Sequence, residues 1–389
     1  MKRKKNTGEF LLLCLLMLAL GCLYTWSYLA VLLEDTLQWN SGMTADIFTC
    51  SIIFYSVGNI MGGILSKRVR GRSIFLISAV CILAGLWCAA DIRSYGAVMG
   101  FYGVLYSLGV GLAYNTGMSL AKRHLGQNMG TGMGILLFAN GSTAFLAGGL
   151  LQGLLDTRGI SGTVRVLGLV ITAVVLLCML VSQTPDKRQN GGKSEISFRI
   201  LKEKKFYLLY LWGGLLAAMG LFVVGKSTSI LAEITEEPFL LAGIAGAVAV
   251  CNGAGRIISG QLFDRKGTFW CIRKLSVLAA TVTLLLFISF VNRWGWVCAA
   301  AILLCAYLMG AVSPSIAMFA KTYFDNEDYE INFSIFASEI VISSLIGSTL
   351  TGKMAVHFGS YQNSILMLVA MAWTAWAVGA YFLKIQKCE

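Results

Sequence analysis

The sequence predicts an all-α membrane protein with twelve transmembrane helices arranged in two six-helix bundles. Three observations support this prediction: twelve long apolar runs, two halves that repeat each other, and an uneven distribution of positive charge. The chain has 389 residues, of which 57% are hydrophobic and 13% are charged. That charged share is about half the usual value for soluble proteins. A soluble domain does not bury twelve such helices around one core, so a lipid bilayer is the expected environment.

The twelve apolar runs are each near or above the ~20 residues that span the hydrocarbon of a bilayer. They cover approximately residues 9–33, 46–66, 72–91, 95–121, 130–155, 162–182, 206–233, 240–262, 272–291, 295–320, 330–353 and 361–383. The first run follows a basic start, but it is too long for a signal peptide and has no small-residue cleavage site. We therefore expect it to form the first transmembrane helix.

The two halves of the chain repeat each other at nearly one offset. The aligned segments are 21–34 with 220–233 and 121–125 with 320–324, both at an offset of 199, and 63–68 with 260–265 at an offset of 197. Parallel repeats of this kind are a transporter plan in which the substrate lies at the repeat interface near mid-membrane. The sequence thus predicts a first bundle over 1–182, a central loop over 183–205 and a second bundle over 206–389.

Positive charge indicates which ends of the helices face the cytoplasm. With the N-terminus inside, 24 of the 31 Lys and Arg residues fall in inner segments, 4 in outer loops and 3 within spans. The positive-inside rule then places both termini and the central loop in the cytoplasm. The expected location is the cell membrane, which in a bacterium is the inner membrane. The net charge of +12 reflects topology and contact with anionic lipid rather than nucleic-acid binding, which needs a basic groove with stacking aromatics.

The sequence predicts neither an enzyme nor a cofactor site. Its 11 Cys residues are scattered without a C-x-x-C pair, and it has only two His residues, so no metal site is expected. Residues 220–227 match the phosphate-binding pattern G-x-x-x-x-G-K-[ST]. They lie within an apolar span, however, where helical N–H groups are already bonded to carbonyls. Nucleotide hydrolysis is therefore not expected.

Three charged residues, Arg256, Lys226 and Glu339, lie away from the ends of predicted spans, where such residues usually face a partner or a water-filled cavity. Arg256 lies in the eighth span, about 12 Å along the helix from its inner end. It is a candidate anion ligand, and the alternative is an Arg that extends inward or bonds to carbonyls. Lys226 lies in the outer part of the seventh span, and the alternative there is a side chain that reaches the outer surface.

Glu339, in the eleventh span, is the third charged residue and is expected at a depth similar to that of Arg256. It is a candidate partner of Arg256, a candidate proton-coupling group, or both. If the two pair in the empty site, protonation of Glu339 releases Arg256 for the substrate and couples transport to a proton. The alternative is a hydrogen bond from Glu339 to a nearby hydroxyl, such as Ser343 or Ser344. An unpartnered carboxyl in a dry site is expected to be neutral.

Three motifs carry a family resemblance that extends over the whole chain. They are Gly21-x-x-Tyr24-x-Trp26-Ser27, the segment 113–116 followed by 122–130, and Gly255-Arg256-x-x-x-Gly260-x-Leu-x-Asp264-Arg-x-Gly267. Together they resemble the major facilitator superfamily and, within it, the oxalate:formate antiporter family, which is close in plan to monocarboxylate transporters. The resemblance implies the major facilitator fold, binding of a substrate carboxylate by Arg256, and a cavity lined partly by first-helix aromatics. The candidates for that wall are Tyr24, Trp26 and Tyr28, although an interfacial aromatic belt explains some of them equally well.

The chain departs from this family pattern in the eleventh span. Oxalate carriers place a Lys there, whereas this chain has Ile340 at that position beside Glu339, and Lys226 is a candidate for the missing cation. The prediction is a secondary active transporter for a small organic anion, a carboxylate, that works by alternating access as an antiporter or proton symporter and functions as a monomer. The alternatives are a proton-coupled efflux pump for amphipathic compounds, which would not need Arg256, and a membrane sensor, which would normally carry a soluble signalling domain.

Overall fold

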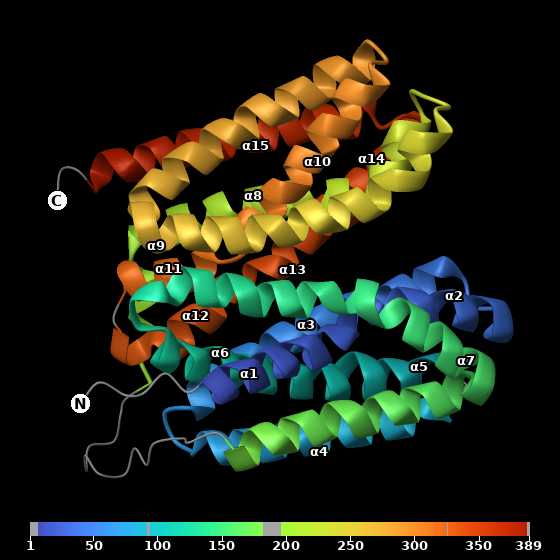
Figure 1. Cartoon of the computed structure of the whole chain (residues 1–389), viewed down its shortest axis with the longest axis vertical. Coiled ribbons are helices and arrows are strands. Elements are labelled where there is room, and N and C mark those ends of the chain that lie inside the picture. The colour runs from blue at the N-terminus through green and yellow to red at the C-terminus, as the bar shows by residue number, and fades with distance from the viewer. Residues whose placement is uncertain (1–6, 92–93, 182–195, 325, 387–389) are drawn as a thin grey trace. The chain divides into compact units, whose positions relative to one another are not determined.

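The computed structural model describes residues 7–91, 94–181, 196–324 and 326–386 (Figure 1). Within these ranges the secondary structure is helical throughout, without a strand, which confirms the all-α prediction. Ten helical stretches among the described residues are long and apolar enough to cross a membrane.

Within each half the described helices follow one another with short connections. Those of the first half are α1 (Thr7–Leu20), η1 (Gly21–Thr25), α2 (Trp26–Leu37), α3 (Ser41–Leu65), α4 (Gly71–Ala90), α5 (Tyr95–Val98), η2 (Met99–Tyr106), α6 (Ser107–Leu125), η3 (Gly126–Asn128) and α7 (Met129–Val181). Those of the second half are η5 (Arg199–Lys202), α8 (Lys204–Ala232), α9 (Pro238–Val291), α10 (Gly295–Val312), α11 (Ser315–Thr322), η6 (Asn326–Asp328), α12 (Tyr329–Ala337), α13 (Glu339–Ser344), η7 (Leu345–Leu350), α14 (Thr351–Phe358) and α15 (Gln362–Ile385). The segments η2 and η7 are π-helical, and the other η segments are 3₁₀ turns.

The ten stretches do not correspond one to one with the expected twelve spans, because glycine turns join neighbouring spans and the predicted fifth span is divided between two stretches, Tyr95–Thr143 and Gly149–Val181. Gly159 lies within α7 at a φ of 64°, and Gly267 lies within α9 at a φ of 80°. Gly126, with a φ of 52°, connects α6 to α7 in the same way. Glycine adopts positive φ without a Cβ clash, so the chain can bend there while helical hydrogen bonds continue on both sides. Two apolar runs consequently lie in one continuous helical stretch.

The chain packs into two compact units. The first consists of Met1–Gly126, Ala139–Ser197 and Glu327–Ala337, and the second of Gln127–Phe138, Phe198–Asn326 and Ser338–Glu389. Each unit therefore includes a short helical segment from the other half of the sequence. Most of the predicted central loop at 183–205 lies outside the described residues, and the domain boundary there remains a prediction.

In the first unit, α3 packs closely against α6. Gly58 of α3 lies against the backbone of Leu108, and Gly111 of α6 lies against the backbone of Tyr55 and Asn59. A Cβ at either glycine would overlap these atoms. Small residues of this kind allow membrane helices to approach closely.

The second unit repeats this packing between α9 and α10, with α8 and α15 alongside (Figure 1). Gly255 lies against the carbonyl of Tyr307, and Gly310 lies against the carbonyl of Asn252. Gly255 and Gly310 are the repeat mates of the two glycines that join α3 and α6. The sequence repeat thus corresponds to a repeated helix–helix contact.

Candidate functional site

Arg256 lies on α9, and polar groups of the second unit accept hydrogen bonds from its guanidinium. Its Nε donates to Oδ1 of Asn252, one turn earlier, at 3.2 Å, and its Nη1 donates to the carbonyl of Leu137 in α7. The start of α7 comes this close because Gly134 lies against the Arg256 carbonyl, where a Cβ would overlap. The side chain is only partly buried. A carbonyl therefore accepts a hydrogen bond from Arg256 in this conformation, as one of the two sequence interpretations expected.

Glu339 is the first residue of α13 and is 4% exposed. Its carboxyl lies against Gly213 in α8, where an added Cβ would meet both carboxyl oxygens. No described residue forms a hydrogen bond or an ion pair with this carboxyl, so the hypothesised pair with Arg256 is not formed in this conformation. The hydroxyl of Ser343 is not its partner either, because it donates to the carbonyl of Gly214 at 2.9 Å.

Lys226 lies on the same helix as Gly213 but is exposed. Among the described residues it forms neither a hydrogen bond nor an ion pair, and it does not meet Glu339. In this conformation Arg256, Lys226 and Glu339 are therefore not joined to one another by ion pairs, although Arg256 and Glu339 were expected at a similar depth.

The aromatic residues predicted to line a cavity wall lie around the break between α1 and α2. Tyr24 lies in the 3₁₀ turn η1 and is partly buried. Trp26 is 4% exposed, its Nε1 donates to the carbonyl of Thr44 at 3.0 Å, and its ring centroid lies 4.5 Å from that of Tyr102. Trp26 is thus an interior side chain of the first unit. The side chain of Tyr28 lies outside the described part of the structure.

Sequence reasoning missed a tyrosine pair in the first unit. Tyr55 of α3 and Tyr114 of α6 share a side-chain hydrogen bond, with their rings edge to face at 5.4 Å. Tyr114 also stacks on Phe333 of α12 at 6.0 Å, and Tyr24 interacts electrostatically with Tyr55. Tyr114 belongs to one of the family motifs, which was an available signal. Tyr55 carried no signal in the sequence.

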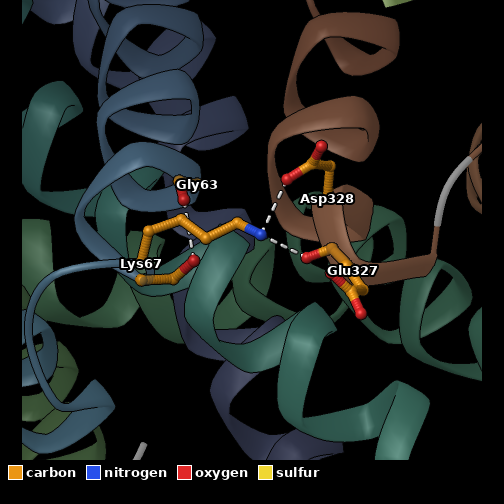
Figure 2. A network of polar contacts seen from close by, with 5 residues as sticks. Gly63, Lys67, Glu327 and Asp328 are labelled. Carbon is orange, nitrogen blue, oxygen red and sulfur yellow. Dashed lines mark hydrogen bonds and ion pairs between the residues drawn. The ribbon is translucent and has the colours of Figure 1, made fainter. Parts of the chain in front are cut away.

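A second missed feature is an ion pair at the end of α3. Nζ of Lys67 lies 2.7 Å from Oδ1 of Asp328 and also donates to the carbonyl of Glu327, as Figure 2 shows. The side chains of Lys67 and Asp328 are 3% and 15% exposed, so this pair is largely shielded from solvent. Gly63, one turn earlier, lies against the carbonyl of Glu330, where a Cβ would be too close.

Asp264 makes the corresponding contact in the second unit. Its Oδ1 accepts a hydrogen bond from the backbone N–H of Gly130 at 2.7 Å. Its Oδ2 accepts bonds from the N–H and the hydroxyl of Thr131, both at 2.7 Å. Gly260, one turn earlier, lies directly against the Gly130 carbonyl. A carboxylate at a helix start bonds to unpaired N–H groups and complements the helix dipole.

Comparisons with known proteins agree with this fold. The sequence model of the Major Facilitator Superfamily matches residues 11–348. The MFS-type transporter pynF of Aspergillus niger is 22% identical over 365 residues, which cover 90% of this chain and 81% of that protein. The E. coli fucose:proton symporter FucP matches with a TM-score of 0.74 at 16% identity, covering 98% of this chain and 99% of that one. The human organic anion transporter MFSD10 matches with a TM-score of 0.69 at 12% identity, covering 97% and 99%.

At these identities the solved structures establish the fold alone. The family match is stronger evidence because it covers most of the chain, including most of both repeats and the helices that carry Arg256 and Glu339. It also agrees with the apolar helical stretches and with the resemblance of the sequence motifs at the level of the superfamily, whereas the narrower resemblance to the oxalate:formate antiporter family stays a prediction. The chain therefore belongs to the Major Facilitator Superfamily and is a multi-pass membrane transporter rather than an enzyme.

Proposed function

We propose that this transporter carries a small organic anion, a carboxylate, and that Arg256 binds it. The observation that carries the proposal is a partly exposed guanidinium inside an apolar span of α9. Placing an Arg at such a depth costs roughly 3 kcal/mol on insertion scales, and such residues commonly mark substrate pathways. A guanidinium also matches a carboxylate with two parallel hydrogen bonds. Binding of an anionic substrate would explain why the Arg256 guanidinium lies within an apolar span.

The contacts of Arg256 support this role because they fix the plane of the guanidinium. The hydrogen bonds from Nε to Asn252 and from Nη1 to Leu137 use donors at different positions of the planar group. A group held in this way loses less conformational entropy when a ligand binds. Asn252 and the start of α7 are therefore proposed as positioning elements for the anion site.

The remaining predicted site residues are proposed to act around this anion. Tyr24 and Tyr28 would form part of the wall, and Trp26 would support it by holding the start of α2 through its bond to Thr44. Lys226, exposed on α8, would add a second positive charge that attracts the substrate from the outer side.

We further propose that the protein works as a monomer in the cell membrane with both termini in the cytoplasm, because the positive residues favour that orientation. Its two bundles, 1–182 and 206–389, would alternate access to one site on either side of the central loop 183–205.

The test of this function begins with the purified protein and a panel of small mono- and dicarboxylates in a thermal-shift assay. A ligand at about 100 times its Kd stabilises the folded state by about 2.7 kcal/mol, so a true substrate should raise Tm clearly. The best ligand is then used in proteoliposome uptake with wild type, Arg256→Lys and Arg256→Gln. Arg273→Lys, at an exposed position of α9 beyond the Gly267 turn, is the matched control.

We expect Arg256→Lys to lose most transport, since Lys keeps the charge but lacks the planar fork, and Arg256→Gln to lose more. The control should transport at the wild-type rate. Wild-type transport by either Arg256 variant would make this residue structural. Retained activity toward amphipathic compounds, with no response to carboxylates, would identify an efflux pump instead.

A further inference from the structure

Glu339 has a repeat mate, Asn140, that occupies the equivalent place in the first unit at the repeat offset of 199. Each residue directly follows the point at which the chain passes into its unit, at Ala139 and at Ser338. Asn140 is 8% exposed, and its Nδ2 donates to the carbonyl of Met17 in α1 at 3.0 Å. In the first unit, a side-chain donor thus joins α7 to α1.

The second unit packs α13 against α8 in the corresponding way, but without that donor bond. Glu339 lies against Gly213, and no described residue shares a hydrogen bond with its carboxyl. An ionised carboxylate can only accept hydrogen bonds, whereas a neutral carboxylic acid has one O–H to donate. A bound proton would therefore give Glu339 the donor that the amide of Asn140 has permanently.

The backbone of α8 offers an acceptor on this face. Ser343, one turn after Glu339, already donates to the carbonyl of Gly214, although that carbonyl lies within a helix. The first unit shows the same use of helical carbonyls, because the hydroxyl of Thr143 donates to the carbonyl of Leu18 at 2.7 Å. A carbonyl oxygen has two lone pairs and can accept both a helical bond and a side-chain bond.

The charge environment favours the protonated form. The elements packed against α13 are α8 and η7. The titratable side chain on the facing part of α8 is Tyr210, and neither η7 nor the rest of α13 carries a titratable or charged side chain. No cation among the described residues pairs with Glu339. A buried carboxylate without a partner is costly, and binding a proton removes that cost.

The backbone differs between the two units at this point. The helix in the first unit is continuous through Asn140, whereas α12 ends at Ala337 and α13 begins at Glu339. The intervening Ser338 shares a hydrogen bond of 3.0 Å with the hydroxyl of Tyr210 in α8. The joint at Ser338, directly before Glu339 in the chain, therefore contacts the same helix as the carboxyl.

We propose that Glu339 is a proton-binding site that controls the contact between α13 and α8, and with it the joint at Ser338. In the protonated state, the Glu339 hydroxyl donates to a backbone carbonyl of α8. When the proton leaves to bulk water, that bond is lost and the carboxylate moves away from Gly213. The coupling role of this site rests on the transport function proposed above, whereas proton binding itself does not require a known substrate.

Proton binding is tested without substrate by infrared difference spectroscopy of the purified protein between acidic and alkaline pH. We expect wild type to show the band of a protonated carboxyl that disappears at alkaline pH, and Glu339→Gln to lack this band. Glu236→Gln, which removes an exposed carboxylate from the loop between α8 and α9, is the matched control and should keep it. A full band in Glu339→Gln would overturn the proposal.

A second variant covers the case in which Glu339→Gln does not fold. Glu339→Asp keeps an ionisable group but is one methylene shorter, so its carboxyl band should move in frequency. An unmoved band in that variant would assign the signal to another residue and overturn the proposal.

Coupling is tested with the carboxylate found by the thermal-shift panel. An imposed pH gradient should drive its accumulation in wild-type proteoliposomes but not in Glu339→Gln, while counter-flow exchange continues in both. An equal response to the gradient in both proteins would refute the coupling role, as would the absence of any response in wild type. Either result leaves the Arg256 test unaffected, because that test measures uptake and ligand binding without a gradient.

Discussion

Lys67 and Asp264 stand at equivalent positions of the two repeats, yet they anchor the starts of helices with opposite charges. Lys67 pairs with Asp328 just before α12, and Asp264 accepts backbone hydrogen bonds from Gly130 and Thr131 at the start of α7. A carboxylate suits a helix N-terminus directly, whereas a lysine there needs an acidic residue beside it. Asp328 supplies that residue, so the two contacts are alike in position but different in chemistry.

The first prediction concerns the ion pair between Lys67 and Asp328. Lys67→Ala leaves Asp328 without its buried partner, and we expect a destabilisation on the order of 3 kcal/mol, seen as a lower Tm. The exchanged double variant Lys67→Asp/Asp328→Lys should recover part of that loss. Arg68→Ala, an exposed neighbour, is the control and should leave Tm nearly unchanged. If the double variant loses as much in Tm as Lys67→Asp and Asp328→Lys lose together, the ion pair does not stabilise this contact.

The second prediction concerns Asp264. Asp264→Ala removes three hydrogen bonds at the start of α7, and we expect a loss of about 2 kcal/mol in stability. Asp264→Asn keeps one acceptor oxygen and should lose less. The measurement is Tm in detergent at matched lipid content, and equal Tm values for the alanine variant and wild type would contradict it.

The third prediction concerns the contribution of the hydrogen bond between Trp26 and the Thr44 carbonyl to stability. Trp26→Phe keeps an aromatic ring but loses the hydrogen bond to the Thr44 carbonyl, which should cost about 1–2 kcal/mol. Trp296→Phe is the control, because the Trp296 side chain is 61% exposed. Thermal unfolding of the two purified variants checks the difference. A Trp26→Phe protein as stable as the control would show that the bond contributes little.

The fourth prediction concerns topology. A cysteine placed at residue 190 in a background without other cysteines should react with a membrane-impermeant thiol reagent only after the membrane is opened. The same should hold for Cys388 as the sole cysteine. Both positions lie outside the described residues, and the expectation rests on positive charge. A cysteine at Arg158 is predicted to react in intact cells, and labelling with the opposite pattern would invert the orientation.

The sequence predicted the features that depend on local composition. Apolar length marks a membrane span without knowledge of its neighbours, so the spans and their repeat could be read directly. The depth of Arg256 and Glu339 followed from counting residues, but the direction each side chain faces depends on helix rotation and packing. The Lys67 contact with Glu327 joins residues 260 positions apart, and no local pattern announces it. Trp26 was expected to line a wall because the family resemblance implies aromatics of the first helix there, and a resemblance does not fix which way each ring faces.

The close approach of Gly260 to the Gly130 carbonyl has a practical consequence for isolating single conformers. A methyl group added at Gly260 acts as a wedge between α9 and the start of α7. Overpacking of this kind costs about 1–3 kcal/mol, and each 1.4 kcal/mol changes a population ratio about tenfold. Gly260→Ala should therefore increase the population of a conformer in which α9 and the start of α7 lie further apart. That single substitution would provide a sample for determining a state that wild-type protein populates only briefly.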